Sequence, residues 1–248
     1  MNPHAEKKGL SAAVLKWIAA VTMFIDHATY VFFLTWYWRS HRVTVLTRRL
    51  YYILRGVGRI AFPIYCFLLV EGFRRTRSVK NYFLRLSAFA LISEIPFDLA
   101  FNKGPFDWSD QNVFFTLALG LAAVWAWDTV TRSDQAACPL SRLLLAAAAA
   151  GALAYAAYLI KSDYDWRGVL VIMLMHICRD DPAERFGAAG PALLLAGKIE
   201  AASWPDFLLF DLYNGQRGRQ NKYFFYAFYP GHLLFLTLIR ALARGGAG

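Results

Sequence analysis

The residues of this sequence best suited to chemistry are an acid and an imidazole that stand side by side in an apolar segment. Asp26 and His27 lie near the middle of residues 14–38, which are otherwise mostly apolar. A carboxylate at the centre of a membrane-spanning helix costs about 2.5–3.5 kcal/mol on an insertion scale, whereas imidazole suits proton transfer near neutral pH. The pair predicts either catalysis or cofactor contact, or a structural pair that holds this helix to its neighbours.

The next apolar segment, residues 50–72, carries charge near both ends. Arg55 and Arg59 are four residues apart and share one helix face, and Pro63 with the nearby glycines predicts a bend. Glu71 lies about 18 Å from Arg59 by helical rise, so the two side chains cannot pair with each other. For Arg59, binding of a phosphate or carboxylate and a structural ion pair both remain open.

Two carboxylates follow in residues 82–101, on either side of a proline. Glu94 and Asp98 are four apart, with Pro96 between them. They could orient a base, bind a cation or neutralise an arginine across the bundle, and Glu94 is the better functional candidate because it lies deeper. Asp110 is expected to cap the following helix, and Asn112 to hydrogen-bond inside the bundle.

The last apolar segment contains Tyr229 and His232, three residues apart beside Pro230. His232 is either structural or a second proton-transfer or acyl-binding group. The turn before it, YNGQRGR, contains Arg217 and is basic and glycine-rich. Such a turn can place amides and guanidinium groups near an anion, or can be a tight extramembrane turn.

A basic loop, FRRTRSVK, follows the second apolar segment and contains Arg74, Arg75 and Lys80. It could hold a phosphorylated cofactor, or it could anchor the chain to anionic headgroups. The sequence alone leaves both interpretations open.

The elements that must position these residues are apolar helices. The chain is 58% hydrophobic and 18% charged, and its apolar residues form long blocks between short basic loops. We therefore predict an all-α integral membrane protein: a cytoplasmic tail (1–13), one transmembrane helical domain (14–241) and a C-terminal tail (242–248). The domain is expected to contain about eight transmembrane helices: 14–38, 50–72, 82–101, 112–130, 142–161, 165–178, 186–204 and 222–241.

The net charge of +10 has a topological explanation. Basic residues sit mainly between apolar blocks, which is typical of membrane insertion and argues against nucleic-acid binding. Loops on the N-terminal side carry more Lys and Arg, which predicts that both termini face the cytoplasm. The three cysteines are far apart, so neither a disulfide framework nor a metal site is expected.

Several motifs, in order along nearly the whole chain, resemble the TraX family of membrane proteins. They are MFIDH, GRIAFPIYCFLLVEGFRRTRSVKNYFLRLSAFALISEIPFDLAF, NVFFTLALG, YNGQRGR and YAFYPGHLLFL. The resemblance implies an acetyltransferase of the bacterial inner membrane, related to transmembrane acyltransferases, that acetylates an amine such as the N-terminus of pilin. It implies acetyl-CoA as the donor. No metal is expected, because the sequence contains neither an HExxH motif nor a pair of metal-binding cysteines.

The family pattern implicates Asp26, His27, Arg59, Pro63, Glu71, Glu94, Asp98, Asn112, Tyr229, Pro230 and His232. We expect catalytic roles for His27, Asp26, Glu94 and His232. Cofactor binding is expected from Arg59, Arg74, Arg75, Lys80 and Asn112, and substrate binding from Glu71, Asp98, Tyr229 and Arg217.

In the expected mechanism His27 is the general base, and Asp26 orients it. A covalent acetyl-histidine intermediate is the alternative. Two other classes of protein remain open: a proton-coupled transporter that relays protons through its carboxylates, and a membrane subunit that scaffolds a pilus or secretion complex.

Overall fold

The computed structural model describes residues 9–40, 43–101, 104–133 and 138–245. Over these residues the chain forms helices and no β-strand, which confirms the predicted all-α fold. The elements are α1 (Ala12–Ser40), α2 (Val45–Gly58), α3 (Ala61–Arg75), α4 (Val79–Ala100), α5 (Val113–Thr131), α6 (Pro139–Leu159), α7 (Asp165–Ile177), α8 (Pro182–Leu193), the 3-10 helix η1 (Lys198–Ser203), α9 (Asp206–Asp211) and α10 (Lys222–Gly245).

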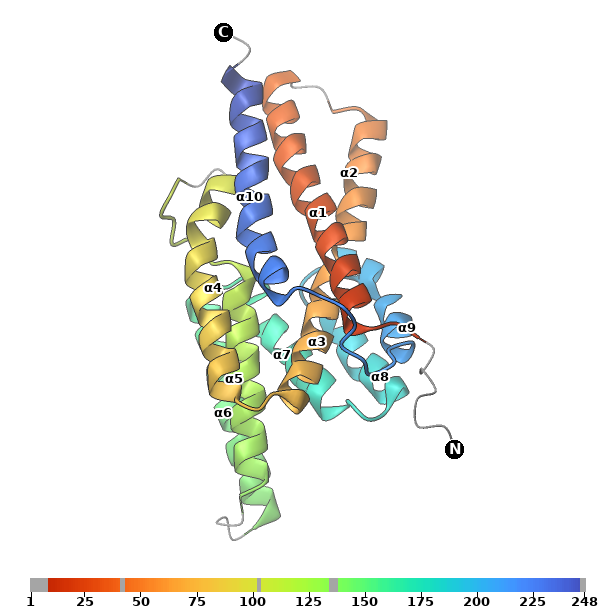
Figure 1. Cartoon of the computed structure of the whole chain (residues 1–248), viewed down its shortest axis with the longest axis vertical. Coiled ribbons are helices and arrows are strands. Elements are labelled where there is room, and N and C mark those ends of the chain that lie inside the picture. Colours follow the sequence, from red (N-terminus) through yellow and green to blue (C-terminus); the bar gives the residue numbers. More distant parts are fainter. Residues whose placement is uncertain (1–8, 41–42, 102–103, 134–137, 246–248) are drawn as a thin grey trace.

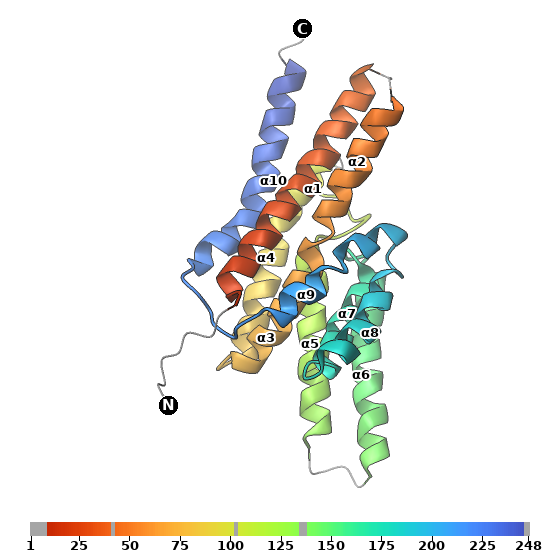
Figure 2. The same cartoon turned by 90° about the vertical axis from the view of Figure 1, so that its right-hand side faces the viewer.

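The helices form an elongated bundle whose two ends are built from different helices (Figures 1 and 2). At one end α1 and α10 lie side by side and run in the same direction, with α2 beside α1. At the other end α5 and α6 form an antiparallel pair. Residues from the beginning, middle and end of the chain can therefore meet halfway along the bundle.

The segment predicted as one span over residues 50–72 is two helices with a bend between them. α2 ends at Gly58 and α3 begins at Ala61, and the N–H of Arg59 donates to the carbonyl of Gly56 at 3.1 Å. Pro63 stands in the first turn of α3, where its missing N–H costs no helical hydrogen bond. The predicted bend is confirmed, and it places Arg59 at the junction.

Five helical segments of the described chain are long and apolar enough to cross a membrane. The predicted number of about eight is not confirmed. α7 and α8 have 13 and 12 residues, which gives about 20 and 18 Å against a hydrocarbon core of about 30 Å. α4 is long enough at 22 residues, but its charged side chains lower its hydropathy. The five segments are Ala12–Phe33, Val45–Arg75, Val113–Thr131, Pro139–Leu159 and Tyr223–Ala243.

The core fills the space between α1, α3, α5, α7 and α10. Leu15, Ile64, Leu121, Ile172 and Leu233 are fully buried there. Each buried leucine or isoleucine contributes about 1.5–3 kcal/mol relative to an exposed one in water. This packing makes the middle of the bundle a rigid frame for the polar residues inside it.

Asp206, at the start of α9, is a buried carboxyl group with no hydrogen-bond partner among the described residues. Burial raises its pKa from 3.8 to about 8. The folded state therefore keeps this proton up to about pH 8, whereas the unfolded state loses it near pH 4. Stability must fall as pH rises through this window, by at most about 1.4 kcal/mol per pH unit for one proton.

We expect Asp206→Asn to remove this loss. Thermal unfolding in detergent should show that the stability of the variant relative to wild type increases steadily from pH 5 to pH 8. Parallel pH profiles for the two proteins would show that Asp206 does not hold its proton in the fold.

A candidate active site at the middle of the bundle

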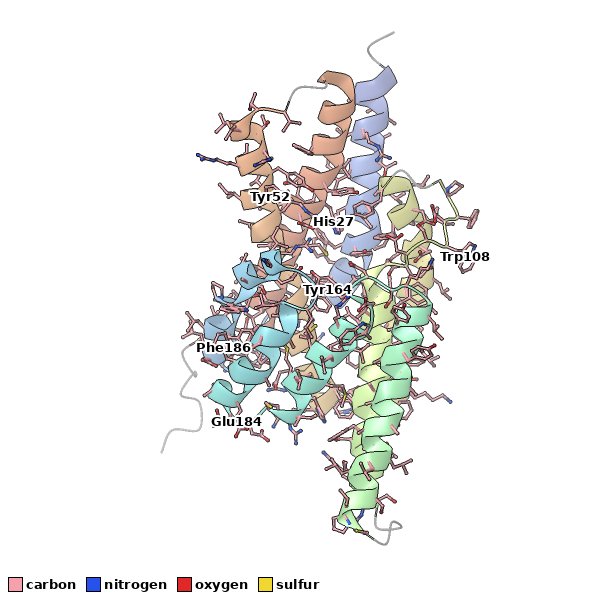
Figure 3. The ribbon with its side chains drawn as sticks, turned by 180° about the vertical axis from the view of Figure 1, so that it is seen from behind. His27, Tyr52, Trp108, Tyr164, Glu184 and Phe186 are labelled. Atoms are coloured by element: carbon pink, nitrogen blue, oxygen red, sulfur yellow. The ribbon has the colours of Figure 1, made fainter. Side chains whose placement is uncertain are left out.

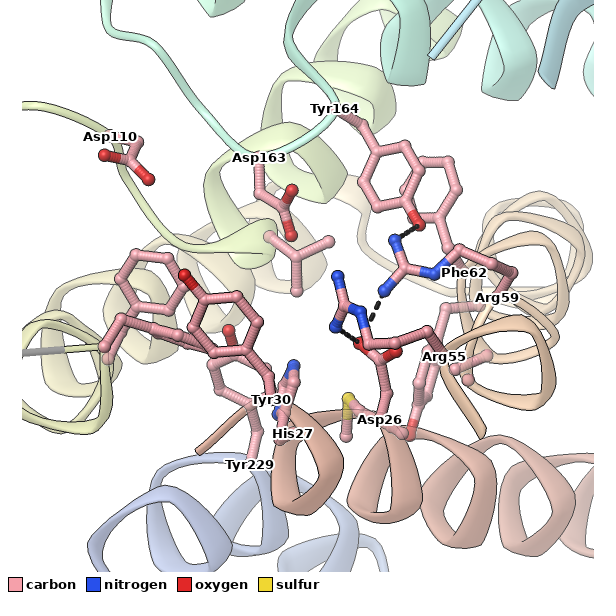
Figure 4. A pocket seen from close by; sticks show the side chains of 17 residues that line it. Asp26, His27, Tyr30, Arg55, Arg59, Phe62, Asp110, Asp163, Tyr164 and Tyr229 are labelled. Carbon is pink, nitrogen blue, oxygen red and sulfur yellow. Dashed lines mark hydrogen bonds and ion pairs between the residues drawn. The ribbon is translucent and has the colours of Figure 1, made fainter. Parts of the chain in front are cut away.

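A cavity of about 250 Å³ lies where α1, α2 and α3 meet α10 and the loop before α7 (Figure 4). Figure 3 shows His27 and Tyr164 close to the middle of the long axis, one from each side of this region. The ionisable and hydroxyl side chains that line the cavity are Asp26, His27, Tyr30, Arg55, Arg59, Tyr65, Asp110, Asp163, Tyr164 and Tyr229.

Asp26 binds two arginines at the end of α2: Arg55 in its last turn and Arg59 directly after it. Its Oδ2 accepts from Nη1 of Arg55 at 2.6 Å and from Nη2 of Arg59 at 2.5 Å, and the carboxylate is almost fully buried. The four-residue spacing of the arginines turns both toward α1, as their shared helix face predicts. A buried charge of this kind is stabilised only when its partners stay in place.

Gly58 lets α2 approach Asp26 this closely, because a Cβ atom at this position would overlap the Asp26 side chain. We expect Gly58→Ala to push Asp26 away from its arginines and to cost about 1–3 kcal/mol, the usual cost of overpacking. Gly151→Ala is the matched control, since a Cβ there meets nothing within 4 Å. Thermal unfolding should separate the two, and equal stability of both variants would contradict the close contact.

Arg59 also reaches the opposite wall of the cavity. Its Nη1 donates to the Tyr164 hydroxyl at 3.2 Å and to Oε1 of Glu200, in η1, at 3.3 Å. The Tyr164 ring stacks on Phe62 with centroids 3.7 Å apart. Burial raises the pKa of Glu200 to about 7, against the opposing effect of the Arg59 guanidinium. One arginine thus ties α1, η1 and the loop before α7 together.

The loop before α7 brings Asp163 and Tyr164 to the cavity in a strained conformation. Lys161, Tyr164 and Asp165 have φ angles of +54°, +64° and +42°. Non-glycine residues in this region cost of order 1–3 kcal/mol each and persist only when surrounding structure fixes them. Here Gln111 fixes the loop: its N–H donates to the Lys161 carbonyl at 2.9 Å, and its carbonyl accepts from the Asp163 N–H at 2.8 Å.

His27 has a histidine partner from the last helix. Its Nδ1 lies 2.7 Å from Nε2 of His232, and the two rings are almost parallel, at 6°. Nδ1 of His232 lies 2.8 Å from the carbonyl oxygen of Phe228. Because a carbonyl only accepts, Nδ1 of His232 carries the proton, and its Nε2 in the neutral ring is an acceptor.

The same rule then fixes the tautomer of His27. Nδ1 of His27 must donate to His232, which leaves Nε2 of His27 unprotonated when both rings are neutral. His27 lines the cavity (Figure 4). An oriented imidazole with a free nitrogen at a polar cavity can serve as a general base.

The orienting partner of His27 therefore differs from the predicted one. Asp26 was expected to orient the ring, but Asp26 is bound by Arg55 and Arg59, while His232 occupies the orienting position. Neighbours on a helix are separated by about 100°, so Asp26 and His27 face different partners.

Three other predicted residues hold α4 to its surroundings and are not among the residues that line the cavity. Glu94 accepts hydrogen bonds from the side-chain amide of Asn112 and, at 3.4 Å, from its N–H. Asn112, not Asp110, caps α5, because its side chain accepts from the N–H of Phe114. Asp98 is fully buried and accepts from the N–H of Asp107 at 2.9 Å.

The predicted groups at the far end of α3 also lie away from the cavity. Glu71 pairs with Arg74 at 3.3 Å and with Arg75 at 2.9 Å on its own helix. Lys80, at the start of α4, is exposed. Tyr229 lines the cavity as expected from its position near His232.

The polar residues that sequence reasoning left out of the predicted site include Arg55, Asp163 and Tyr164, which line the cavity, and Glu200, which binds Arg59. Of these, only Arg55 lies at a helical spacing from a predicted residue, four positions before Arg59. The other three come from a loop and from a 3-10 helix, where no periodic pattern exists. Their one sequence signal is polarity, in KSDYD and KIEAAS, between apolar blocks.

Comparison with known proteins identifies related chains. The family model described as TraX protein matches residues 11–240. A protein of Dichelobacter nodosus described as probable fimbrial assembly protein FimC, serogroup H1, is 30% identical over 254 residues, which covers 91% of this chain and 94% of that protein. No solved structure matches this chain.

Proposed function

Because the chain belongs to the TraX family, we propose that it is a membrane acetyltransferase that moves an acetyl group from acetyl-CoA to an amine. The observation that carries this proposal is the free Nε2 of His27 at a polar cavity, held by His232. The fimbrial assembly description of the Dichelobacter relative supports a pilin-like acceptor. We place the protein in the bacterial cytoplasmic membrane.

In the proposed reaction, Nε2 of His27 accepts a proton from the acceptor amine as its nitrogen attacks the acetyl carbonyl carbon. The carbon–sulfur bond then breaks, and the sulfur leaves with the proton that His27 returns. His232 keeps the His27 ring in the basic tautomer. The Arg55 guanidinium, which lines the cavity, is positioned to stabilise the oxyanion that forms during attack.

Asp26 serves a positioning role in this mechanism. Its carboxylate fixes Arg55 and Arg59 toward the cavity, and Glu200 and Tyr164 hold Arg59 from the other side. Asp26 thus contributes to catalysis indirectly, by positioning Arg55 and Arg59, and not by orienting His27.

The test is acetyl transfer by the purified protein in lipid nanodiscs. Acetyl-CoA labelled on its acetyl group is mixed with a pilin-like peptide, and the same peptide with a blocked N-terminus is the control. Label on the free peptide with equal release of CoA thiol supports the proposal. Absence of both transfer and acetyl-CoA binding would overturn it, and uptake driven by a pH gradient would then be measured.

The direction of the helices leads to a topological prediction. α1 and α10 run in the same direction, so if both cross the membrane their starts share one side (Figure 1). We therefore place the start of α1 in the cytoplasm and the end of α10 outside it, rather than both ends in the cytoplasm. A reporter that is active only outside the cytoplasm should be active when fused to the C-terminus and inactive when fused to the N-terminus. Equal reporter activity in the two fusions would contradict this topology.

A further inference from the structure

A second and larger cavity, of about 430 Å³, opens beside the first. Most of its wall is apolar or aromatic, including Leu68, Leu86 and Phe114. Three basic residues, Lys16, Arg85 and Arg217, also line it, and they come from α1, α4 and the loop before α10. A cavity with an apolar wall and positive charge suits an amphiphile with an anionic end.

The three basic side chains are available for such a ligand. Within the described residues, none of them pairs with a carboxylate. Lys16 lies over the Phe225 ring at 5.7 Å, and Arg85 and Arg217 are exposed. By contrast, Arg74 and Arg75 are already paired with Glu71.

The loop that carries Arg217 is fixed against the start of α1. The carbonyl of Arg217 accepts from the N–H of Ala13 at 3.1 Å, and the carbonyl of Gln216 accepts from the N–H of Ala12 at 2.9 Å. These bonds satisfy N–H groups that a helix start leaves free. They hold Arg217 close to Lys16, one turn into the same helix.

The two cavities adjoin, because Met23, Tyr65, Val113 and Tyr229 line both of them. Lys16 and His27 belong to one helix and are about 16 Å apart by helical rise. An extended pantetheine arm can span such a length. Tyr65 and Tyr229 stand where a thioester carried by that arm would meet the cavity of His27.

We propose that the second cavity is the entrance of the acyl-CoA donor, with Lys16, Arg85 and Arg217 binding its phosphates. This inference rests on the proposed acetyltransferase function. The donor's arm follows the apolar wall to Tyr65 and Tyr229, and the acceptor amine reaches His27 from the other cavity. The two substrates thus approach from different sides, and the donor never crosses the bundle.

The test is CoA binding, measured with the full-length protein in nanodiscs of neutral lipid. The triple variant Lys16→Gln, Arg85→Gln, Arg217→Gln is compared with the control Arg48→Gln, Arg49→Gln, Arg77→Gln, which removes equal charge at exposed residues that do not line the cavity. We expect at least about tenfold weaker CoA binding by the first variant, as the loss of one charge-assisted hydrogen bond already predicts. The control should bind like wild type.

Pantetheine, which lacks the phosphates, reports on the folding of the variants. Equal binding of pantetheine by wild type and both triple variants shows that only phosphate recognition has changed. Wild-type binding of CoA together with equal weakening in both triple variants, or in neither, would overturn the entrance and leave the acetyltransferase intact. Failure of wild type to bind CoA at all would overturn both proposals.

Anionic lipid is the alternative source of a phosphate at these residues. The measurement is therefore repeated in nanodiscs that contain phosphatidylglycerol. Unchanged affinity of wild type for CoA supports a soluble donor. Loss of CoA binding in the anionic nanodiscs would show that lipid headgroups occupy the three basic residues, and it would overturn the proposal.

Discussion

His27→Ala is expected to reduce acetyl transfer by about 10²–10⁴-fold, the usual contribution of a general base. The imidazole is the group at the cavity whose tautomer leaves a nitrogen free to take the proton of the attacking amine. Binding of CoA should be unchanged, because the loss concerns the chemical step. The measurement is the rate of labelled peptide formation beside the affinity for CoA.

Two variants of His232 separate orientation from packing. In His232→Gln the amide oxygen can still accept the proton of Nδ1 of His27, whereas His232→Leu offers no acceptor at similar volume. We expect the leucine variant to lose about tenfold to a hundredfold in kcat, and the glutamine variant to retain most activity.

The pattern across the histidine variants decides the mechanism. Full activity of His27→Ala would show that another group is the base. Stable label on wild-type protein that disappears in His27→Ala would show a covalent acetyl-histidine instead of direct transfer. Equal loss in both His232 variants would mean that packing, and not the hydrogen bond, matters at that position.

Arg59→Met is expected to lower the unfolding free energy by about 3–5 kcal/mol, the typical result of leaving a buried charge unpaired. Arg59 is the largely buried cation between Asp26 and Glu200, and within the described parts of the chain Glu200 forms an ion pair with no other arginine. Arg59→Lys should restore little of the lost unfolding free energy. The lysine ammonium group lacks the planar, forked guanidinium that lets Arg59 bind both carboxylates at once.

A double-mutant cycle tests this interpretation. If Asp26 and Arg59 stabilise each other, Asp26→Asn combined with Arg59→Met should cost clearly less than the sum of the single changes. Thermal unfolding in detergent gives the stabilities of the wild type, the two single variants and the double variant. Additive costs would show that the two side chains act independently and would contradict the network.

Much of the fold and part of the site follow from the sequence. Asp26 and His27 stand out because polar groups are costly within an apolar helix, and the four-residue spacing of Arg55 and Arg59 sets their common face. The bend at Pro63 was predictable for a similarly local reason. Each of these features depends on residues close together in the chain.

The remainder of the site depends on contacts that no local pattern specifies. His232 was a candidate, but its bond to His27 depends on α10 packing beside α1. Tyr164 reaches the cavity through a left-handed conformation that a tyrosine rarely adopts, and Glu200 reaches Arg59 from a 3-10 helix. The apolar blocks at 165–178 and 186–204 resemble spans in composition, while their helices are too short for a bilayer.

The pairing of His27 with His232 also sets an order of events during biosynthesis. The two residues are 205 positions apart, and a ribosome adds about 5–20 residues per second, so His27 enters the membrane roughly 10–40 s before its partner is made. During this interval the imidazole has neither a fixed tautomer nor its neighbour. In the proposed mechanism, a growing or truncated chain without the final helix therefore has no oriented base.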